Sequence, residues 1–209
     1  MIQYFIISDG SSDRLLIHPI DWIFKSKGIE SKGERIDFGL SGLYPKTIAE
    51  KIEMAIIIHP NLEFLFIHRD AEKQSIDIRI QEIESELLKT AIENIETIKI
   101  IPIRMSEAWL LIDEKALRKA AGKPSGKIKI QLPQTKKLES LANPKDLLKT
   151  ALENASEYSG RKKAQFDFNE ARQLVSQYIE DFSELRQLSA FQRLEADIDL
   201  LLKKLNKKK

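Results

Sequence analysis

Acidic side chains stand directly after three of the apolar runs in the first half of the chain, where strands are expected to end. These acidic residues are Asp9 after the first expected strand, Asp70 and Glu72 after the third, and Glu107 after the fourth. In an open α/β sheet, ligands bind in the crevice outside the carboxyl ends of the strands. Carboxylate oxygens are the ligands that Mg²⁺ accepts while it keeps several waters. The pattern therefore predicts a cation site, with the carboxylates of Asp9, Asp70 and Glu72 within about 4–8 Å of one another. Glu107 is expected at its rim.

Three of these four positions also have a purely structural explanation. An aspartate in a strand-to-helix turn, such as Asp9, often caps the following helix. Asp70 could close an Asx-turn, and Glu107 in a first helical turn is favoured by the helix dipole alone. Their joint placement after three strands favours the site.

Strand and helix patterns alternate around these positions. Short apolar runs typical of buried strands are separated by segments with apolar side chains at helical spacing. Strands are expected at 3–8, 35–38, 63–68 and 97–103. Helices are expected at 13–27 with a kink at Pro19, at 45–58, at 76–91, and at 107–121 between a Ser106 cap and Gly122. This order predicts an α/β fold with a four-stranded, mainly parallel sheet and helices on both faces.

The pattern changes after Gly122. The segment 123–142 is punctuated by Lys and Pro, and three later helices are expected to start at Asn143-Pro144, at Asp167 and at Ser189. The sequence thus predicts an α/β domain over 1–122, which carries the expected cation site, and a basic, mainly helical lobe over 123–209 packed on it.

Composition excludes several classes of protein. The 209 residues contain no cysteine, which rules out disulfide frameworks, thiolate zinc sites, iron–sulfur clusters and cysteine nucleophiles. The N-terminal segment lacks the basic region and small-residue cleavage site of a signal peptide. No run approaches the roughly 18 apolar residues that cross a bilayer. We therefore expect a soluble, cytoplasmic protein without a membrane partner.

The net charge of +2 conceals an uneven distribution. Residues 1–113 carry 13 basic and 19 acidic side chains, whereas residues 115–163 carry 13 basic and 4 acidic ones. An acidic part joined to a basic part suits a metal site that acts on a polyanion, although a solvated lysine-rich surface would have the same composition. Phosphate contacts of this kind give affinity without sequence preference. The residues expected to bind nucleic acid are Arg69, Lys127, Lys129, Lys136, Lys137 and, in a loop after Gly160, Arg161, Lys162 and Lys163.

The last expected helix carries a seam of apolar residues over 191–205. Its members, Phe191, Leu194, Ile198, Leu201 and Leu205, recur at spacings of 3, 4, 3 and 4, as in a coiled coil. Packing on the chain's own domain is favoured because two heptads are short. A homo-oligomer, or the docking of a partner, is the alternative.

Three motifs together resemble the Toprim domain, and most closely the small OLD/Toprim-type nuclease-like proteins of bacterial phage-defence loci. The first motif is Asp9-Gly10-Ser11-Ser12-Asp13, where the family usually begins with glutamate. The second is Asp70-Ala71-Glu72, and the third is Glu107-Ala108-Trp109-Leu110-Leu111. The resemblance covers roughly residues 1–122.

The resemblance implies metal-dependent hydrolysis of a phosphodiester bond in DNA or RNA. It implies Asp9, Asp70, Glu72 and Glu107 as catalytic residues, with the first three holding Mg²⁺ or Mn²⁺. Two other activities of the family are disfavoured. A topoisomerase would need a nucleophilic tyrosine on a separate strand-passage domain, and a bacterial primase would need a zinc domain with cysteines, which this chain lacks. An antiviral defence role with an ABC- or OLD-type ATPase partner is also implied by the resemblance alone.

Two other functions stay open. The shorter side chain of Asp9 favours a non-catalytic module that binds nucleic acid or a partner through a degraded site, whereas the retained Asp70, Glu72 and Glu107 disfavour it. A small RNA-processing enzyme is the third hypothesis.

Overall fold

In the computed structural model, which describes residues 1–8, 13–42, 44–92 and 94–207, four strands form an all-parallel sheet in the order β2-β1-β3-β4. The strands are β1 (Ile2–Ser8), β2 (Ser31–Arg35), β3 (Phe64–His68) and β4 (Glu96–Ile100). Phe5 pairs with Leu65 and Ser8 pairs with His68 in the central β1–β3 ladder. The predicted α/β class with a mainly parallel sheet is confirmed.

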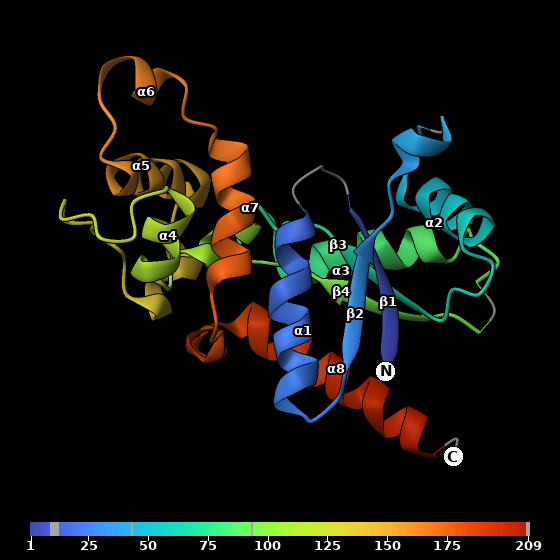
Figure 1. The fold of residues 1–209 in the computed structure, drawn as a ribbon. Coiled ribbons are helices and arrows are strands. Elements are labelled where there is room, and N and C mark those ends of the chain that lie inside the picture. The colour runs from blue at the N-terminus through green and yellow to red at the C-terminus, as the bar shows by residue number, and fades with distance from the viewer. Residues whose placement is uncertain (9–12, 43, 93, 208–209) are drawn as a thin grey trace. The chain divides into compact units, whose positions relative to one another are not determined.

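The central strands are apolar because both faces of the sheet are covered. Every residue of β3 is buried. Phe5, Ile7, Leu65 and Ile67 pack with Ile52 of α2 (Ile48–Ile58) and Ile83 of α3 (Ile76–Leu87). On the opposite face, Tyr4 lies 5.8 Å from Phe24 of α1 (Ile17–Ser26) and 4.7 Å from Phe66, measured between ring centroids. Figure 1 shows α1 on one side of the strands and α3 on the other.

The second strand lies earlier in the chain than its expected position at 35–38. It is the polar edge segment Ser31–Arg35, paired with β1 alone. The Asp37 side chain accepts a hydrogen bond from the Gly39 N–H at 3.0 Å and caps the 3₁₀ helix Phe38–Ser41. Local capping therefore takes the chain out of the sheet where the apolar residues had suggested a strand. Pro19 lies in the first turn of α1, where its ring is tolerated, rather than at a kink.

Gly33 of β2 allows the edge strand to approach a buried tyrosine. It pairs with Tyr4, and a Cβ at position 33 would lie 2.4 Å from the Tyr4 ring. The Tyr4 hydroxyl donates to Asp21 Oδ1 at 3.0 Å. Burial raises the pKa of this phenol well above its ordinary value, and the Asp21 charge raises it further. The ring therefore has little freedom to move away.

Gly33→Ala is expected to lower the free energy of unfolding by about 1–3 kcal/mol, because the added methyl group overpacks this contact. Urea denaturation measures the change. Lys32→Ala, at the exposed neighbouring position of the same strand, should stay within about 0.5 kcal/mol of the unchanged chain. Equal unfolding midpoints for the two variants would contradict the packing of Gly33 on Tyr4.

The chain divides into two compact units. The first unit comprises residues 1–101 and 193–209, and the second comprises residues 102–192. This division differs from the expected boundary at residue 122. The 3₁₀ helix Ser106–Leu110 is wholly buried and packs against α5 (Pro144–Ser156) and α7 (Phe168–Tyr178), which places the segment after β4 in the second unit.

The expected helix over 107–121 is interrupted. The 3₁₀ helix Ser106–Leu110 precedes a separate helix, α4 (Glu114–Ala120). Asp113 Oδ1 accepts hydrogen bonds from the backbone N–H groups of Lys115 at 2.8 Å and Ala116 at 3.0 Å, so a new helix begins at this cap. Gly122 follows α4 with φ of 76°, the left-handed conformation expected after a helix.

The remaining elements of the second unit are short helices. Along the chain, the 3₁₀ helix Thr135–Ser140 comes before α5, α6 (Gly160–Ala164) and α7, and the 3₁₀ helix Ser183–Gln187 comes after them. Asn143 and Asp167 cap α5 and α7, as their sequences predicted. Arg161, Lys162 and Lys163, expected in a loop, form the single turn of α6.

The last helix, α8 (Ser189–Lys207), begins in the second unit and continues into the first. Its seam residues Phe191, Leu194, Ile198 and Leu201 are buried within the chain. In the first unit, Lys27 Nζ lies 2.8 Å from Asp199 Oδ1, and Lys204 Nζ lies 3.0 Å from Glu96 Oε2. The seam thus packs on its own chain, as the sequence favoured. No helix in the described ranges is long and apolar enough to cross a membrane.

Candidate functional site

The site begins where two neighbouring parallel strands end together. Ser8, the last residue of β1, is in register with His68, the last residue of β3. Asp70 follows two positions after His68, at the carboxyl edge of the sheet. Asp9 is the next residue of the sequence after Ser8 and lies outside the described residues, so its convergence with Asp70 stays a prediction.

The turn after β3 presents its two acids on either side of a buried residue. Ala71 is 1% exposed and belongs to the core shared with α2 and α3. Asp70 and Glu72 flank it, with 24% and 64% of their side chains exposed. Glu72 adopts φ of 54°, a left-handed conformation that costs a residue with a Cβ about 1–2 kcal/mol. Strained backbone of this kind is concentrated at functional sites.

His68 orients the Asp70 carboxylate. Its Nε2 lies 3.2 Å from Asp70 Oδ1, and its side chain is 6% exposed. Because an ionised carboxylate only accepts hydrogen bonds, Nε2 must carry the hydrogen for this contact to be favourable. The hydrogen bond from His68 therefore limits the rotation of the Asp70 carboxylate.

Glu72 belongs to a network of ion pairs. Its Oε2 lies 3.3 Å from Arg79 Nη2, and Arg79 Nη1 donates to Glu82 Oε2 at 2.8 Å. Arg69 Nη1 lies 3.3 Å from the same Glu82 oxygen. The hydrogen bond from Arg79 lowers the pKa of the Glu82 carboxyl below its ordinary value, and the charge of Arg69 adds to this effect. Two guanidinium groups thus stand next to the acidic turn.

Lys51 is a residue of this edge that the sequence analysis missed. It lies on α2, is 8% exposed, and donates from Nζ to the Ser8 carbonyl oxygen at 2.6 Å. Its position could have been noticed, because Ile48, Lys51, Ile52 and Ala55 follow the i, i+3, i+4, i+7 spacing of a buried helix face. A lysine on such a face needs a polar partner, and here that partner is the end of β1.

The predicted metal ligands are only partly brought together. Among the described residues, no group of three His, Asp or Glu side chains is arranged to hold a metal ion. The partly exposed Asp70 carboxylate has the oxygen chemistry that a hard cation takes. Glu72 would have to give up its ion pair with Arg79 to bind the same cation as Asp70. The ligand set of Asp9, Asp70 and Glu72 therefore stays a prediction, for which Asp70 is the best-placed member.

Glu107 is buried and paired within the second unit, and its expected place at the rim of the site stays a prediction. It lies in the second unit and is 3% exposed, and its Oε1 accepts a hydrogen bond from Arg172 Nη1 at 2.5 Å. Arg172 also lies over the Phe168 ring, 5.6 Å from its centroid. This buried ion pair accounts for Glu107 by itself, because a buried carboxylate requires a partner.

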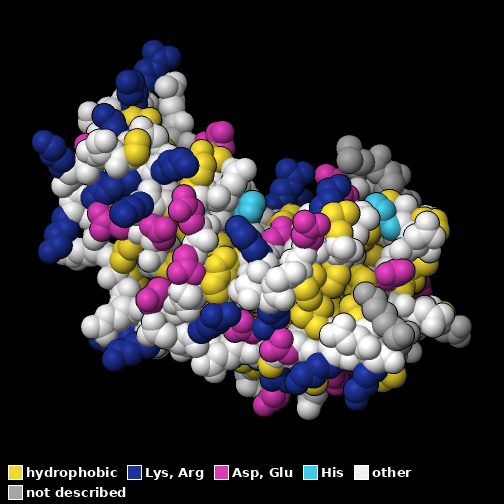
Figure 2. Space-filling model, turned by 60° about the horizontal axis from the view of Figure 1, so that its bottom comes forward, with side chains coloured by type: hydrophobic (Ala, Val, Ile, Leu, Met, Phe, Trp, Pro, Cys, Tyr) yellow, Lys and Arg dark blue, Asp and Glu magenta, His cyan; other side chains and the backbone are white. Residues whose placement is uncertain are grey.

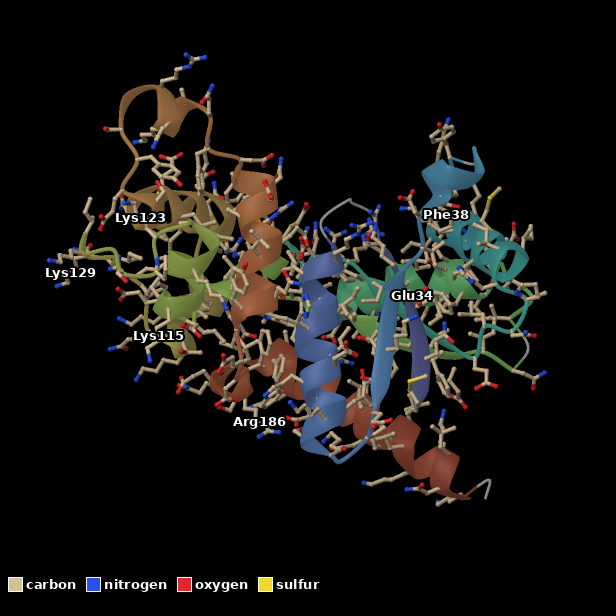
Figure 3. All side chains as sticks on the ribbon, viewed as in Figure 1. Glu34, Phe38, Lys115, Lys123, Lys129 and Arg186 are labelled. Carbon is tan, nitrogen blue, oxygen red and sulfur yellow. The ribbon has the colours of Figure 1, made fainter. Side chains whose placement is uncertain are left out.

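The predicted nucleic-acid-binding residues of the second unit are exposed. They are Lys127, Lys129, Lys136, Lys137, Arg161, Lys162 and Lys163. The Lys127 and Ile128 N–H groups both donate to the Glu157 carboxylate, the latter at 2.8 Å, which holds the backbone of this segment. These two bonds lower the pKa of the Glu157 carboxyl below its ordinary value. Figure 3 shows Lys115, Lys123 and Lys129 extending outward from α4 and the segment after it.

These cations stand among acids. Lys163 Nζ lies 3.6 Å from Glu153 Oε2. On the face drawn in Figure 2, Asp and Glu side chains lie among the Lys and Arg side chains, without a regular order. In the sequence, the surplus of positive charge lies in residues 115–163, and acidic side chains such as Glu153 offset part of it.

Comparison with known proteins adds no relative. The chain matches no family model, no curated protein and no solved structure.

Proposed function

We propose that this chain is a Mg²⁺- or Mn²⁺-dependent enzyme that hydrolyses phosphodiester bonds of DNA or RNA at the carboxyl edge of β1 and β3. The observation that supports it most is the pairing of Ser8 with His68, which brings the end of β1 beside the turn that carries Asp70. Asp9 follows Ser8 directly in the sequence. Lys51, Arg69 and Arg79 add positive charge at this edge, where a phosphate would approach.

Each residue has a role that follows from its surroundings. When bound, the cation would activate water and neutralise the charge that develops on the phosphate. Asp70 supplies carboxylate oxygens, and His68 keeps them oriented. The partly exposed Arg69 guanidinium is suited to contact a phosphate oxygen. Lys51 holds the end of β1 and places a positive charge at this edge.

The resemblance to Toprim-type defence proteins supports a further part of the proposal. The chain would act as an effector of anti-phage defence together with an ABC- or OLD-type ATPase. Because the first four seam residues of 191–205 are buried within the chain, a homo-oligomer through this helix would use its exposed side, for example Leu200, which is 57% exposed.

A binding module without catalysis is the second candidate. The pairing of Glu72 with Arg79 and the burial of Glu107 against Arg172 favour it, since both acids already have cationic partners. In this case the chain would bind nucleic acid, or a partner, without cutting.

Metal removal separates the two candidates. The full chain is incubated with supercoiled plasmid, single-stranded DNA and RNA, in Mg²⁺, in Mn²⁺ and in excess EDTA. The proposed enzyme cuts at least one substrate with either metal and none in EDTA. Binding that weakens steeply with salt, without cleavage of any substrate in either metal, would instead support the binding module.

A further inference from the structure

A pocket of about 450 Å³ opens within the second unit, and none of its lining residues belongs to the acidic turn after β3. It is formed by the end of α4, the region around α6 and the start of α7. Figure 1 shows α6 as a single turn joined to α5 and α7 by two extended connections. The side chains that matter for the argument are Tyr158, Lys162, Gln165, Phe166 and Glu170, together with Gly122. The volume falls in the range of about 300–1,000 Å³ that is typical of small-ligand sites.

Two half-buried aromatic rings form one part of the wall. The Tyr158 and Phe166 ring centroids lie 6.4 Å apart, at an interplanar angle of 68°. In such an edge-to-face pair, one ring keeps both of its faces free of the other ring. The rings come from either side of α6, and a flat ligand that enters the pocket meets an aromatic surface.

Gly122 makes room for the tyrosine. A Cβ at this position would lie 3.1 Å from Tyr158 Oη, and the φ of 76° also favours glycine. Among the described residues, no hydrogen bond to Tyr158 Oη is present, although its ring lines the pocket. The phenol can therefore donate to, or accept from, a bound molecule.

The polar lining is mixed in a way that suits a nucleotide. Lys162 supplies a positive charge, with Arg161 and Lys163 exposed on the same turn of α6. Gln165 offers an amide, and Asp167 and Glu170 offer carboxylates, which are groups that hydrogen-bond the edges of bases. An apolar ligand would make no use of these polar groups, and a simple anion would make no use of the two rings.

We propose that this pocket binds an unstacked nucleobase of a single-stranded nucleic acid, with the adjoining phosphates on Arg161 and Lys162. The inference rests on the proposed function for the presence of a nucleic-acid substrate. A base in a duplex is stacked and paired, so it cannot reach the two rings. Stacking of bases on aromatic side chains beside a positive surface is the way in which proteins hold single strands.

The test compares two oligonucleotides of equal length and charge, a single-stranded DNA with bases and its abasic counterpart, by fluorescence anisotropy in EDTA. The unchanged chain should bind the strand with bases about 5-fold to 150-fold more tightly, the range for one stacked base. Tyr158→Leu and Phe166→Leu should remove most of this preference. Tyr178→Leu is the matched control, because Tyr178 lies in the same unit under Lys119 and outside the pocket.

A variant with Arg161, Lys162 and Lys163 replaced by alanine should weaken the binding of both strands and reduce its salt dependence. AMP should displace the labelled single strand at a lower concentration than ribose 5-phosphate, which lacks the base. Equal displacement by the two compounds would count against a base in the pocket. Equal affinity of the unchanged chain for the two strands, or preferred binding of a duplex, would overturn the proposal whatever the variants do.

The proposed hydrolysis is judged separately. Base-dependent binding without cleavage would keep the pocket and reject the enzyme. Cleavage with equal affinity for both strands would keep the enzyme and reject the pocket.

Discussion

Replacing Asp70 with asparagine is expected to reduce the proposed metal-dependent cleavage by at least about 100-fold. Loss of a residue that only supports a metal ligand typically reduces metal affinity or activity by about 10-fold to 100-fold, and the loss of a ligand should have at least the larger effect. Asparagine keeps the size of the side chain and can still contact His68, whose Nε2 lies 3.2 Å from Asp70 Oδ1. It removes the negative charge that a hard cation requires. Nucleic-acid binding should persist or tighten, because a negative group near the phosphates is gone. The measurement is the cleavage rate in Mg²⁺, with binding measured in EDTA.

The matched control is Glu30→Gln, which removes the same charge from an exposed residue just before β2, at the opposite edge of the sheet. It should cleave at the rate of the unchanged chain. Thermal unfolding of both variants should match the unchanged chain, so that a lost activity is not lost folding. An Asp70→Asn protein that cuts at the original rate would remove Asp70 from the chemistry and, with it, the proposed site.

Replacing Arg172 with methionine is expected to lower the free energy of unfolding by about 3–5 kcal/mol, the usual effect of removing one partner of a buried ion pair. Glu107 and Arg172 have side chains that are 4% and 6% exposed. Without the guanidinium, the Glu107 carboxylate would stay buried without its countercharge or would have to take up a proton. The urea midpoint, followed by tryptophan fluorescence in a Trp22→Phe background so that Trp109 of the second unit is the reporter, measures the change.

Two companion variants identify the cause of the loss. Lys145→Met makes a similar change at an exposed position of α5 and should stay within about 0.5 kcal/mol of the unchanged chain. Adding Glu107→Gln to Arg172→Met should recover part of the lost stability, because the uncompensated charge is removed. If Arg172→Met alone unfolds within 1 kcal/mol (about fivefold in the folding equilibrium) of the unchanged chain, the ion pair does not explain Glu107, and its predicted catalytic role gains weight.

Several parts of this fold could be predicted because their causes are local. The apolar runs of β1 and β3 indicated buried strands without knowledge of any neighbour. Asn143 and Asp167 predicted the starts of α5 and α7, since a cap bonds to an N–H only three residues away. The placement of Asp70 at a strand end followed from the same local patterns.

The polar edge strand and the extent of the two units could not be predicted in this way. β2 has the sequence Ser-Lys-Gly-Glu-Arg, and only its pairing with β1 makes it a strand. The packing of α8 in the first unit buries Ile198 and Leu201 and brings Lys204 to Glu96. Such pairings join distant segments, and no local pattern announces them.

By itself, the sequence determined the α/β class, the main helices and the acid at the end of β3, because hydrophobic period, capping and the alternation of strands and helices along the chain can be read from short segments. The tertiary structure alone decided which charges meet. In the folded chain, Lys51 hydrogen-bonds to the end of β1, and Glu72 forms an ion pair with Arg79. Glu107 is buried against Arg172, a residue 65 positions away. The physical reason is that the free energy of a charge depends on its burial and on the partner within a few ångströms, and both are set by packing between segments that are far apart in the chain.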